Sequence, residues 1–172
     1  EVVGVDVDFG RFDPSRFDAE LVEEARRMWH MRAHTEFRSV QIMTRFMAEV
    51  TGAGDPIDVY AAGVDLIEDE VRHTALCVGM CQALGFEARF PEPIRPDEPD
   101  DFIAAEMGER ALHTAITMVA INEAISYGFI TDLHERCQEP TVGAVLDATI
   151  ADEEGHQDLG WVYIDKSLGR FP

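Results

Sequence analysis

The sequence contains two copies of the pattern E-x-x-H, at Glu70–His73 and Glu153–His156. In a helix, residues three apart share one face, because three residues turn through about 300° and rise about 4.5 Å. Each copy could therefore aim a carboxylate and an imidazole at one point, and both groups are ligands for divalent metal ions. A single E-x-x-H is a weak signal, so the elements that position the two copies must decide whether they act together.

Apolar residues recur with the helical period in four segments, and the turn sequences "TGAGDP" and "CQEP" separate the members of each pair. The predicted helices cover residues 14–50, 57–84, 102–136 and 141–168. In the third helix the inward stripe is predicted to include Leu112, Ile116 and Val119. We predict an all-α fold in which these helices form a four-helix bundle.

The segments outside the helices complete one domain over residues 1–172. Residues 1–17 are predicted to form an extended arm and residues 18–168 the bundle. Residues 86–101 hold four prolines, which are incompatible with a helix interior. We expect this connection to cross the length of the bundle, so that helices two and three run parallel.

Two lone glutamates, Glu36 and Glu123, also interrupt the apolar stripes. The midpoint of Glu36 and Glu70 is residue 53, inside "TGAGDP", and the midpoint of Glu123 and Glu153 is residue 138, inside "CQEP". Helices joined by a tight turn run antiparallel, so residues equidistant from the turn face each other. Each hairpin therefore places a lone glutamate level with an E-x-x-H, and the whole pattern occurs twice.

Four carboxylates in a helical core would repel one another, and each would cost several kcal/mol if unpaired. Two divalent cations carry +4 against this charge of −4, and each histidine supplies one nitrogen. Oxygen donors with one imidazole per ion suit iron or manganese better than zinc. The alternative is that these residues are solvated on helices of a different phase. The predicted metal ligands are Glu36, Glu70, His73, Glu123, Glu153 and His156.

This set resembles the ferritin-like di-iron carboxylate proteins, whose bundle uses one Glu from each of two helices and Glu-x-x-His from the other two. The resemblance covers about residues 18–168. It implies that Glu70 and Glu153 each bind a metal near their own histidine or bridge the two ions. It also implies that Glu36 and Glu123 complete the two ligand sets.

The sequence "DEVRH" at residues 69–73 resembles the D-E-x-R-H of oxygen-activating di-iron monooxygenases and related oxidases. The resemblance implies that Asp69 and Asp152 each accept a hydrogen bond from the ligand histidine of the other helix, with Arg72 beside them. A ligating imidazole needs such an acceptor for its free N–H. The second copy, "DEEGH", has Gly155 in place of the arginine.

These features favour a non-haem protein with two iron ions that activates O₂ to oxidise or oxygenate a small-molecule substrate, supplied with electrons by a donor protein. Manganese, or one ion of each metal, fits the same donors.

Tyr127, one turn after Glu123, is a candidate for forming a hydrogen bond to a ligand carboxylate or for relaying an electron. The alternative is that Tyr127 is an ordinary core residue. The competing functions are a ferroxidase or iron-storage protein and a structural bundle without turnover. A pocket lined by Gly63, Gly160 and Ala120 would favour an organic substrate, whereas an acidic path and cage-like assembly would favour iron.

Composition narrows the partners. Acids outnumber bases by 34 to 14, giving a formal charge of −20, which argues against nucleic acid or an anionic membrane surface. There is no run of 18 or more apolar residues, so no transmembrane helix is predicted. The three cysteines form no CxxC pair, which favours reduced thiols in the cytoplasm. The composition is also compatible with a homo-oligomer.

Overall fold

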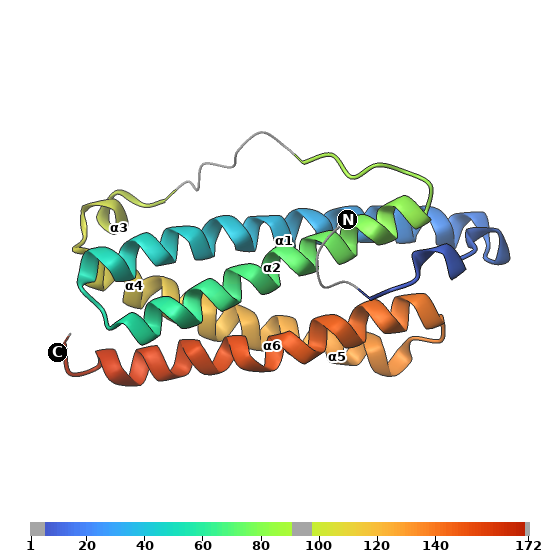
Figure 1. Ribbon diagram of the computed structural model, residues 1–172. Coiled ribbons are helices and arrows are strands. Elements are labelled where there is room, and N and C mark those ends of the chain that lie inside the picture. Colours follow the sequence, from blue (N-terminus) through green and yellow to red (C-terminus); the bar gives the residue numbers. More distant parts are fainter. Residues whose placement is uncertain (1–5, 91–97, 171–172) are drawn as a thin grey trace.

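The computed structural model consists of helices that run side by side (Figure 1). It describes residues 6–90 and 98–170, without the side chains of Glu154 and Gln157, and within those ranges no β-strand occurs. The predicted all-α class is confirmed. The elements are the 3-10 turns η1 (Phe9–Arg11) and η2 (Pro14–Arg16), then α1 (Ala19–Ala53), α2 (Ile57–Ala83), α3 (Asp100–Ala104), α4 (Met107–Thr114), the π-helical segment η3 (Ala115–Asn122), α5 (Glu123–Arg136) and α6 (Pro140–Ser167).

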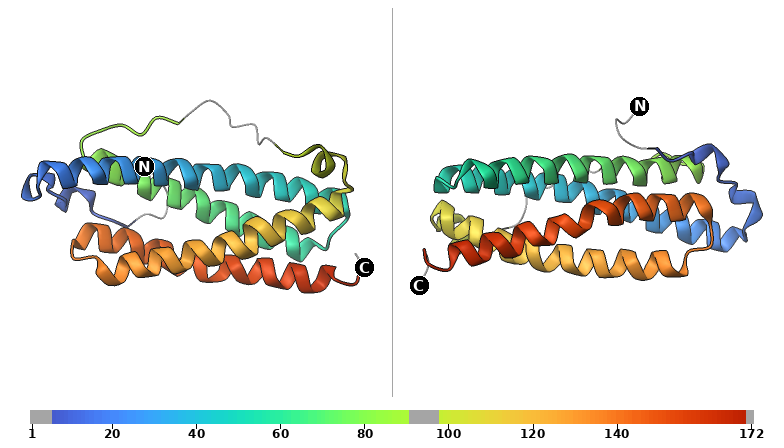
Figure 2. Two further views of the ribbon diagram at one scale, coloured as in Figure 1. Left: turned by 180° about the vertical axis from the view of Figure 1, so that it is seen from behind. Right: turned by 60° about the horizontal axis from the view of Figure 1, so that its bottom comes forward.

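The long helices form two hairpins that pack against each other (Figure 2). The first hairpin is α1 with α2. In the second, α6 packs along a continuous rod made of α4, η3 and α5. The hairpins meet where α1 contacts α4 and where α2 contacts α6. No helix in the described ranges is long and apolar enough to cross a membrane.

Two of the predicted helices differ from those in the structure, one in where it begins and one in its continuity. The first helix begins at Ala19 rather than at residue 14, because the Asp13 side chain accepts a hydrogen bond from the Ser15 N–H and closes a short 3-10 turn instead. The third helix is interrupted, since the backbone of Ala105 and Glu106 is extended between α3 and α4. The interruption at Ala105 and Glu106 carries no glycine or proline that would mark it in the sequence.

The N-terminal segment is packed rather than extended throughout, which corrects the prediction for the described part of residues 1–17. The turn η1 brings the Phe9 ring onto α2, at a position where a Cβ on Gly79 would lie only 2.4 Å from the ring. A glycine is needed there because the aromatic ring occupies the space that a side chain would fill. Residues 1–5 lie outside the described part of the chain.

The turn between α1 and α2 forms where the sequence predicts it. Gly54 ends α1 in the left-handed conformation, with φ of 73°, and its N–H bonds to the carbonyls of the last helical turn. Glycine adopts this conformation without steric cost, and it is the usual residue at such helix ends. The turn reverses the chain, so α1 and α2 run antiparallel and their register is fixed.

The connection after α2 spans much of the length of α1. At its start, the Leu84 carbonyl accepts a hydrogen bond of 2.9 Å from Arg26 Nε, near the beginning of α1. At its end, Met107 of α4 packs against Gly52, near the end of α1. Twenty-six residues (52 − 26) separate these contacts, a rise of about 39 Å. As the sequence predicts, α2 and the α4–η3–α5 rod therefore run in the same direction (Figure 1). Residues 91–97 lie outside the described part.

The π-helical segment changes the phase of the third rod. Ala111 and Ala115 are buried, whereas Leu112 is only half-buried and Ile116 is exposed, so the predicted inward stripe is one residue out before η3. From Val119 onward the predicted phase holds. Sequence counting assumes 3.6 residues per turn throughout, but the i→i+5 bonding of a π-helix takes up an extra residue.

Two apolar clusters fill the interior, one on either side of the predicted site. The cluster near the α1–α2 turn contains Met43, Phe46, Met47, Val50, Leu66, Ala111, Ala115, Val119 and Tyr163. The cluster at the other end contains Trp29, Ala33, Leu76, Cys77, Met80, Cys81, Leu84 and Val145. On α1, Glu36 lies between Ala33 and Met43, and on α2 Glu70 and His73 lie between Leu66 and Leu76. The site therefore lies in the apolar core rather than at a surface.

Another buried acid, Glu49, joins α1 to α4. Its carboxylate is 1% exposed and accepts a hydrogen bond of 2.8 Å from Thr114 Oγ1. It also forms ion pairs with Arg45, at 3.3 Å, and Arg110, at 3.5 Å. Arg45 in turn pairs with Glu98, just before α3. This network ties the end of the long connection to the first hairpin.

Candidate metal centre

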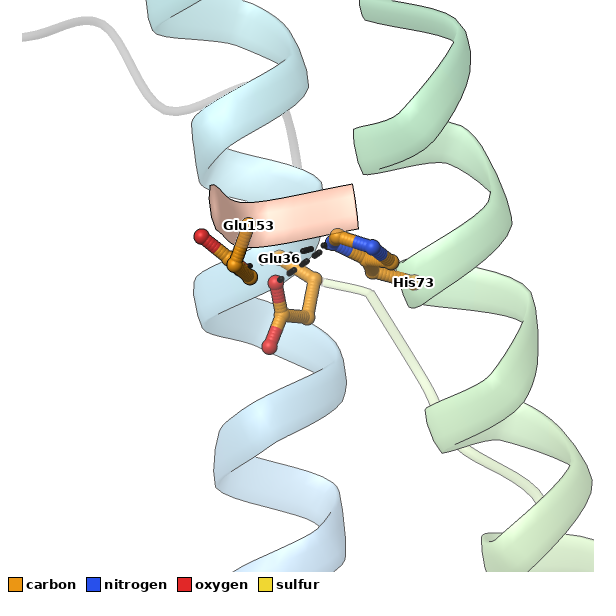
Figure 3. A group of neighbouring side chains, drawn as sticks. All are labelled: Glu36, His73 and Glu153. Carbon is orange, nitrogen blue, oxygen red and sulfur yellow. Dashed lines mark ion pairs between the residues drawn. The ribbon is translucent and has the colours of Figure 1, made fainter. Parts of the chain in front are cut away.

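Glu36 on α1, His73 on α2 and Glu153 on α6 point toward one another between the two apolar clusters (Figure 3). One ligating atom from each lies within 4.8 Å of the others. The Nδ1 atom of His73 is 4.0 Å from Glu36 Oε2 and 3.6 Å from Glu153 Oε1. All three side chains are buried. We call this group position 1.

An equivalent group lies beside it. Glu70 on α2, Glu123 at the start of α5 and His156 on α6 also place one ligating atom each within 4.8 Å of the others. The Nδ1 atom of His156 is 3.8 Å from Glu70 Oε1 and 3.9 Å from Glu123 Oε2. We call this group position 2. All six predicted residues thus lie in two adjacent groups.

Two of the carboxylates face both histidines. Glu70 places Oε2 3.9 Å from Nδ1 of His73 and Oε1 3.8 Å from Nδ1 of His156. Glu153 places Oε1 3.6 Å from Nδ1 of His73 and Oε2 3.5 Å from Nδ1 of His156. Glu36 and Glu123 approach only one histidine each. Two of the carboxylates thus lie between the two histidines, and the other two each lie beside one histidine.

Several buried polar atoms in the cluster have no hydrogen-bond partner in the described part of the chain. Buried polar atoms in proteins are nearly always paired, so such a concentration requires an explanation. Among these atoms are the Nδ1 nitrogens of both histidines, which face the carboxylates. Ionised carboxylates can only accept hydrogen bonds. A pair of cations would supply the missing partner for all of them, so the residues present fit a dimetal site. The unpaired atoms are Glu70 Oε2, His73 Nδ1, Glu123 Oε1, Glu153 Oε2 and His156 Nδ1.

Burial and mutual repulsion favour the protonated form of three carboxyl groups. The pKa of Glu70 is raised well above its usual value by burial and by the neighbouring carboxylates, Glu123 first. Burial also raises the pKa of Glu36, against the opposing effect of Arg32, and raises that of Glu123 to about 7. These groups bind protons at a pH where exposed glutamates are ionised.

The other members of the cluster shift in the opposite sense. Burial disfavours the imidazolium of His156, but its contacts with Glu123 and Glu153 outweigh burial and raise its pKa to about 11. Burial alone would raise the pKa of Glu153, yet the contact with His156 and the nearby histidine charges lower it overall. Without a metal, the cluster is thus balanced by bound protons, which a cation would displace.

The outer ring nitrogens of both histidines bond to aspartates of the opposite helix. His73 Nε2 is 3.2 Å from Asp152 Oδ2, and His156 Nε2 is 3.1 Å from Asp69 Oδ2. The crosswise pairing predicted from the sequence is therefore present. Arg72 contacts both aspartates, donating from Nε to Asp152 at 3.1 Å and pairing with Asp69 through Nη2. One arginine thus serves both copies, although the second copy has a glycine at the matching position.

Sequence reasoning missed Arg32, which contacts the cluster directly. Its Nη2 donates a hydrogen bond of 3.0 Å to Glu36 Oε1, and its side chain is almost fully buried. The guanidinium lies over the Trp29 ring, 5.7 Å from the centroid, and beside the thiol of Cys77. The four-residue spacing from Glu36 was a usable signal, because arginine and glutamate four apart on a helix are neighbours.

Two other expectations concern residues near the cluster. Tyr127 is half-buried on α5, and among the described residues its hydroxyl has no hydrogen bond to any of the six candidate ligands. Gly63 and Gly160 are positions of close helix packing. A Cβ on Gly63 would lie 2.2 Å from Met47 Sδ, and one on Gly160 would lie 2.6 Å from the backbone nitrogen of Ala120. Both glycines let neighbouring helices approach closely.

The fold and the site together define a class: an all-helical protein whose core holds a cluster of four glutamates and two histidines able to bind metal ions. Comparison of the chain with protein-family models, with curated proteins and with solved structures found no match. The assignment of function therefore depends on the geometry and chemistry of the cluster.

Proposed function

We propose that this chain is a ferritin-like dimetal protein whose two ions, iron in the native state, react with O₂ to oxidise a small substrate. The observation that carries the proposal is that Glu70 and Glu153 each turn one oxygen toward each histidine. Two adjacent cations are the simplest partners for carboxylates arranged in this way. The unpaired atoms of the cluster support the same proposal.

The ligand set favours iron or manganese. Each position offers one imidazole nitrogen and several carboxylate oxygens, a set dominated by hard donors. No thiolate is among the ligands, since Cys77 lies beside Arg32 and burial strongly raises its pKa. Two iron(II) ions would carry +4, which would balance the four carboxylates, and such a centre would supply electrons for the reduction of O₂.

The protein's own residues have separate tasks in this proposal. Asp69 and Asp152 hold the Nε2 protons of the histidines, so that both Nδ1 atoms face the metal positions as acceptors. The apolar clusters on either side exclude water and keep the cluster in a medium of low dielectric constant. Electrons for a second turnover would have to come from outside the described chain, for instance from a donor protein.

A second candidate function is iron handling, in which Fe²⁺ is itself the substrate. Close packing at Gly63 and Gly160 favours it, because the pocket that these two glycines were predicted to line for an organic substrate is filled there by neighbouring helices. The formal charge of −20 also favours it, since an acidic surface attracts cations. The D-E-x-R-H sequence and the shared Arg72 contacts favour the oxidase.

Iron titration separates these functions. Metal-free protein is loaded with increasing Fe²⁺ without oxygen and then exposed to air, and the near-ultraviolet absorbance of ferric iron is recorded at each ratio. For an enzyme that keeps its iron as a cofactor, the absorbance should reach a plateau at about two irons per chain. Continued growth far beyond that ratio, in particles the size of a cage, would establish storage instead. Absence of any metal binding would refute the dimetal proposal itself.

A further inference from the structure

The two metal positions have the same ligand types but different surroundings. One helical turn before the terminal ligand Glu36 lies Arg32, a buried cation. One turn before the matching ligand, Glu123, lies Val119, which is buried and apolar. The two halves of the sequence therefore have the same ligand residues, but the residue one turn before the terminal glutamate differs between them.

Arg32 cannot easily leave Glu36. Its side chain is 11% exposed and is packed against Trp29 and Cys77. The alternative to its bond with Glu36 is a buried guanidinium without a partner, which is strongly unfavourable. The pair is therefore a fixed part of position 1.

Because of this pair, the two terminal glutamates differ in the number of carboxylate oxygens that are available to a metal. Glu36 Oε1 is already bonded to Arg32, so only Oε2, 4.0 Å from His73 Nδ1, faces position 1. In Glu123, Oε2 faces His156 at 3.9 Å and Oε1 is unpaired, so both oxygens are available to position 2. Position 1 also lies next to a fixed positive charge, which repels a cation at short range in a medium of low dielectric constant.

We propose that the two positions bind metal unequally, with position 2 filling first and position 1 binding more weakly because Arg32 occupies and neutralises Glu36. This inference rests on the proposed dimetal function and assigns an order to its two positions. Arg32 is a positioning residue here, since it acts on the metal only through Glu36. Position 1 is then the labile half of the centre, the one at which an ion can enter and leave while its neighbour stays bound.

The test is a titration of metal-free protein with Co²⁺ under nitrogen. Visible absorption reports each bound ion, and competition with a chelator gives the two dissociation constants. We expect two steps that differ by at least about tenfold, the size of effect typical of residues that contact a metal ligand. Glu123→Ala should remove the tight step and Glu36→Ala the weak one.

Arg32→Met removes the charge at similar volume, and it should strengthen the weak step by about ten- to a hundredfold while leaving the tight step unchanged. Arg32→Gln, which can still donate to Glu36, guards against a packing defect, and circular dichroism checks folding of both variants. Arg38→Met is the matched control, because Arg38 is exposed on the same helix and carries the same charge. Two equal steps in the wild type, or steps that neither Arg32 variant changes, would overturn the inference and leave the dimetal site intact. A wild type that binds no Co²⁺ would overturn both.

Discussion

Glu49 and Glu70 are buried to the same degree, yet the protein surrounds them in opposite ways. Each is 1% exposed in the core. Glu49 faces two arginines and a threonine hydroxyl, so the chain itself supplies its counter-charge. Glu70 faces other carboxylates and two histidines, and one of its oxygens has no partner among the described residues. The chain's own cations therefore give Glu49 a structural role, whereas the carboxylate of Glu70 remains available to a ligand.

The largest effect should follow from changing Glu70. Glu70→Gln keeps the size of the side chain but removes a charge that faces both positions, so Co²⁺ binding should weaken by more than about a hundredfold at both. The metal-free variant should be more stable than the wild type by about 1–3 kcal/mol at neutral pH, because the wild type must take up a proton on Glu70 or bury a repelled charge when it folds. Competition titration and urea unfolding measure the two quantities. A metal-free variant less stable than the wild type would contradict the contrast with Glu49.

Glu49→Gln should have the opposite effect on stability. It leaves the guanidinium groups of Arg45 and Arg110 without their shared partner, which should destabilise the fold by about 3 kcal/mol. Metal stoichiometry should stay at the wild-type value in the folded variant. Urea unfolding with Glu20→Gln, an exposed change on the same helix, provides the matched control. An unchanged unfolding midpoint would show that this ion network contributes nothing to stability.

The stability of the metal-free protein should fall as pH rises. The folded state holds a proton on Glu123 up to a pKa of about 7, whereas the unfolded chain releases it near the usual value of 4.5. The folded state therefore binds more protons between these values, and this stabilisation, roughly 2–3 kcal/mol, is lost as pH rises from about 4.5 to about 7. His156 acts in the same direction at higher pH, since its raised pKa of about 11 stabilises the folded state below 6.5 and is lost as pH rises through 11.

Urea unfolding at a series of pH values, with chelator present, measures this dependence. Glu123→Gln should make the profile less steep between about pH 4.5 and pH 7, because one of the titrating groups is gone. The same series with bound Co²⁺ should show stability that rises with pH over that range, since the ion replaces the protons. A metal-free profile that does not change with pH would refute the assigned direction of the Glu123 shift.

Smaller effects should separate the two outer aspartates. Asp152→Asn should weaken metal binding at position 1 by about ten- to a hundredfold, because it alters the hydrogen bond that orients His73. Asp69→Asn should act in the same way on position 2 through His156. The two-step Co²⁺ titration resolves which step moves. If both variants changed the same step, the crosswise assignment would be wrong.

The smallest effect is expected from Tyr127→Phe. The hydroxyl has no hydrogen bond to the candidate ligands in the described structure, so stability should change by less than about 0.5 kcal/mol and both metal steps should be unchanged. The rate of iron oxidation in air distinguishes the remaining alternatives. A slower rate with unchanged binding would support the electron-relay role, and an unchanged rate would leave Tyr127 as core.

The sequence was sufficient for features that depend on periodicity and symmetry. The stripes interrupted by Glu36, Glu70, Glu123 and Glu153 follow from counting residues, and the hairpin register follows from antiparallel pairing across two turns. The sequence was insufficient where a residue's surroundings decide its state. An arginine within a helix is expected to be exposed to solvent. That Arg32 is buried becomes clear only from the structure, in which its guanidinium packs against the Trp29 ring.

Local backbone changes were also beyond sequence reasoning. The segment "AITMVAIN" has no glycine or proline, so nothing in its residue types distinguishes a π-helix from an α-helix. The break at Ala105 and Glu106 is likewise made of residues that are common in helices. At the π-helical segment, a tertiary contact accompanies the change of backbone. There Gly160 lets α6 approach the backbone of Val119 and Ala120 closely.

The π-helical segment also has a consequence for how this chain can change length over evolutionary time. Insertions and deletions are usually tolerated in loops and excluded from helices. Here, loss of one residue between Ala115 and Asn122 could convert the segment to a regular α-helix with little loss of helical content. Glu123 would then stay on the face that points toward His156, because the π-helical bonding takes up the one residue that is lost. A relative lacking that residue would keep both the fold and this terminal ligand, so a one-residue difference in the length of this segment need not change which relatives can hold two ions.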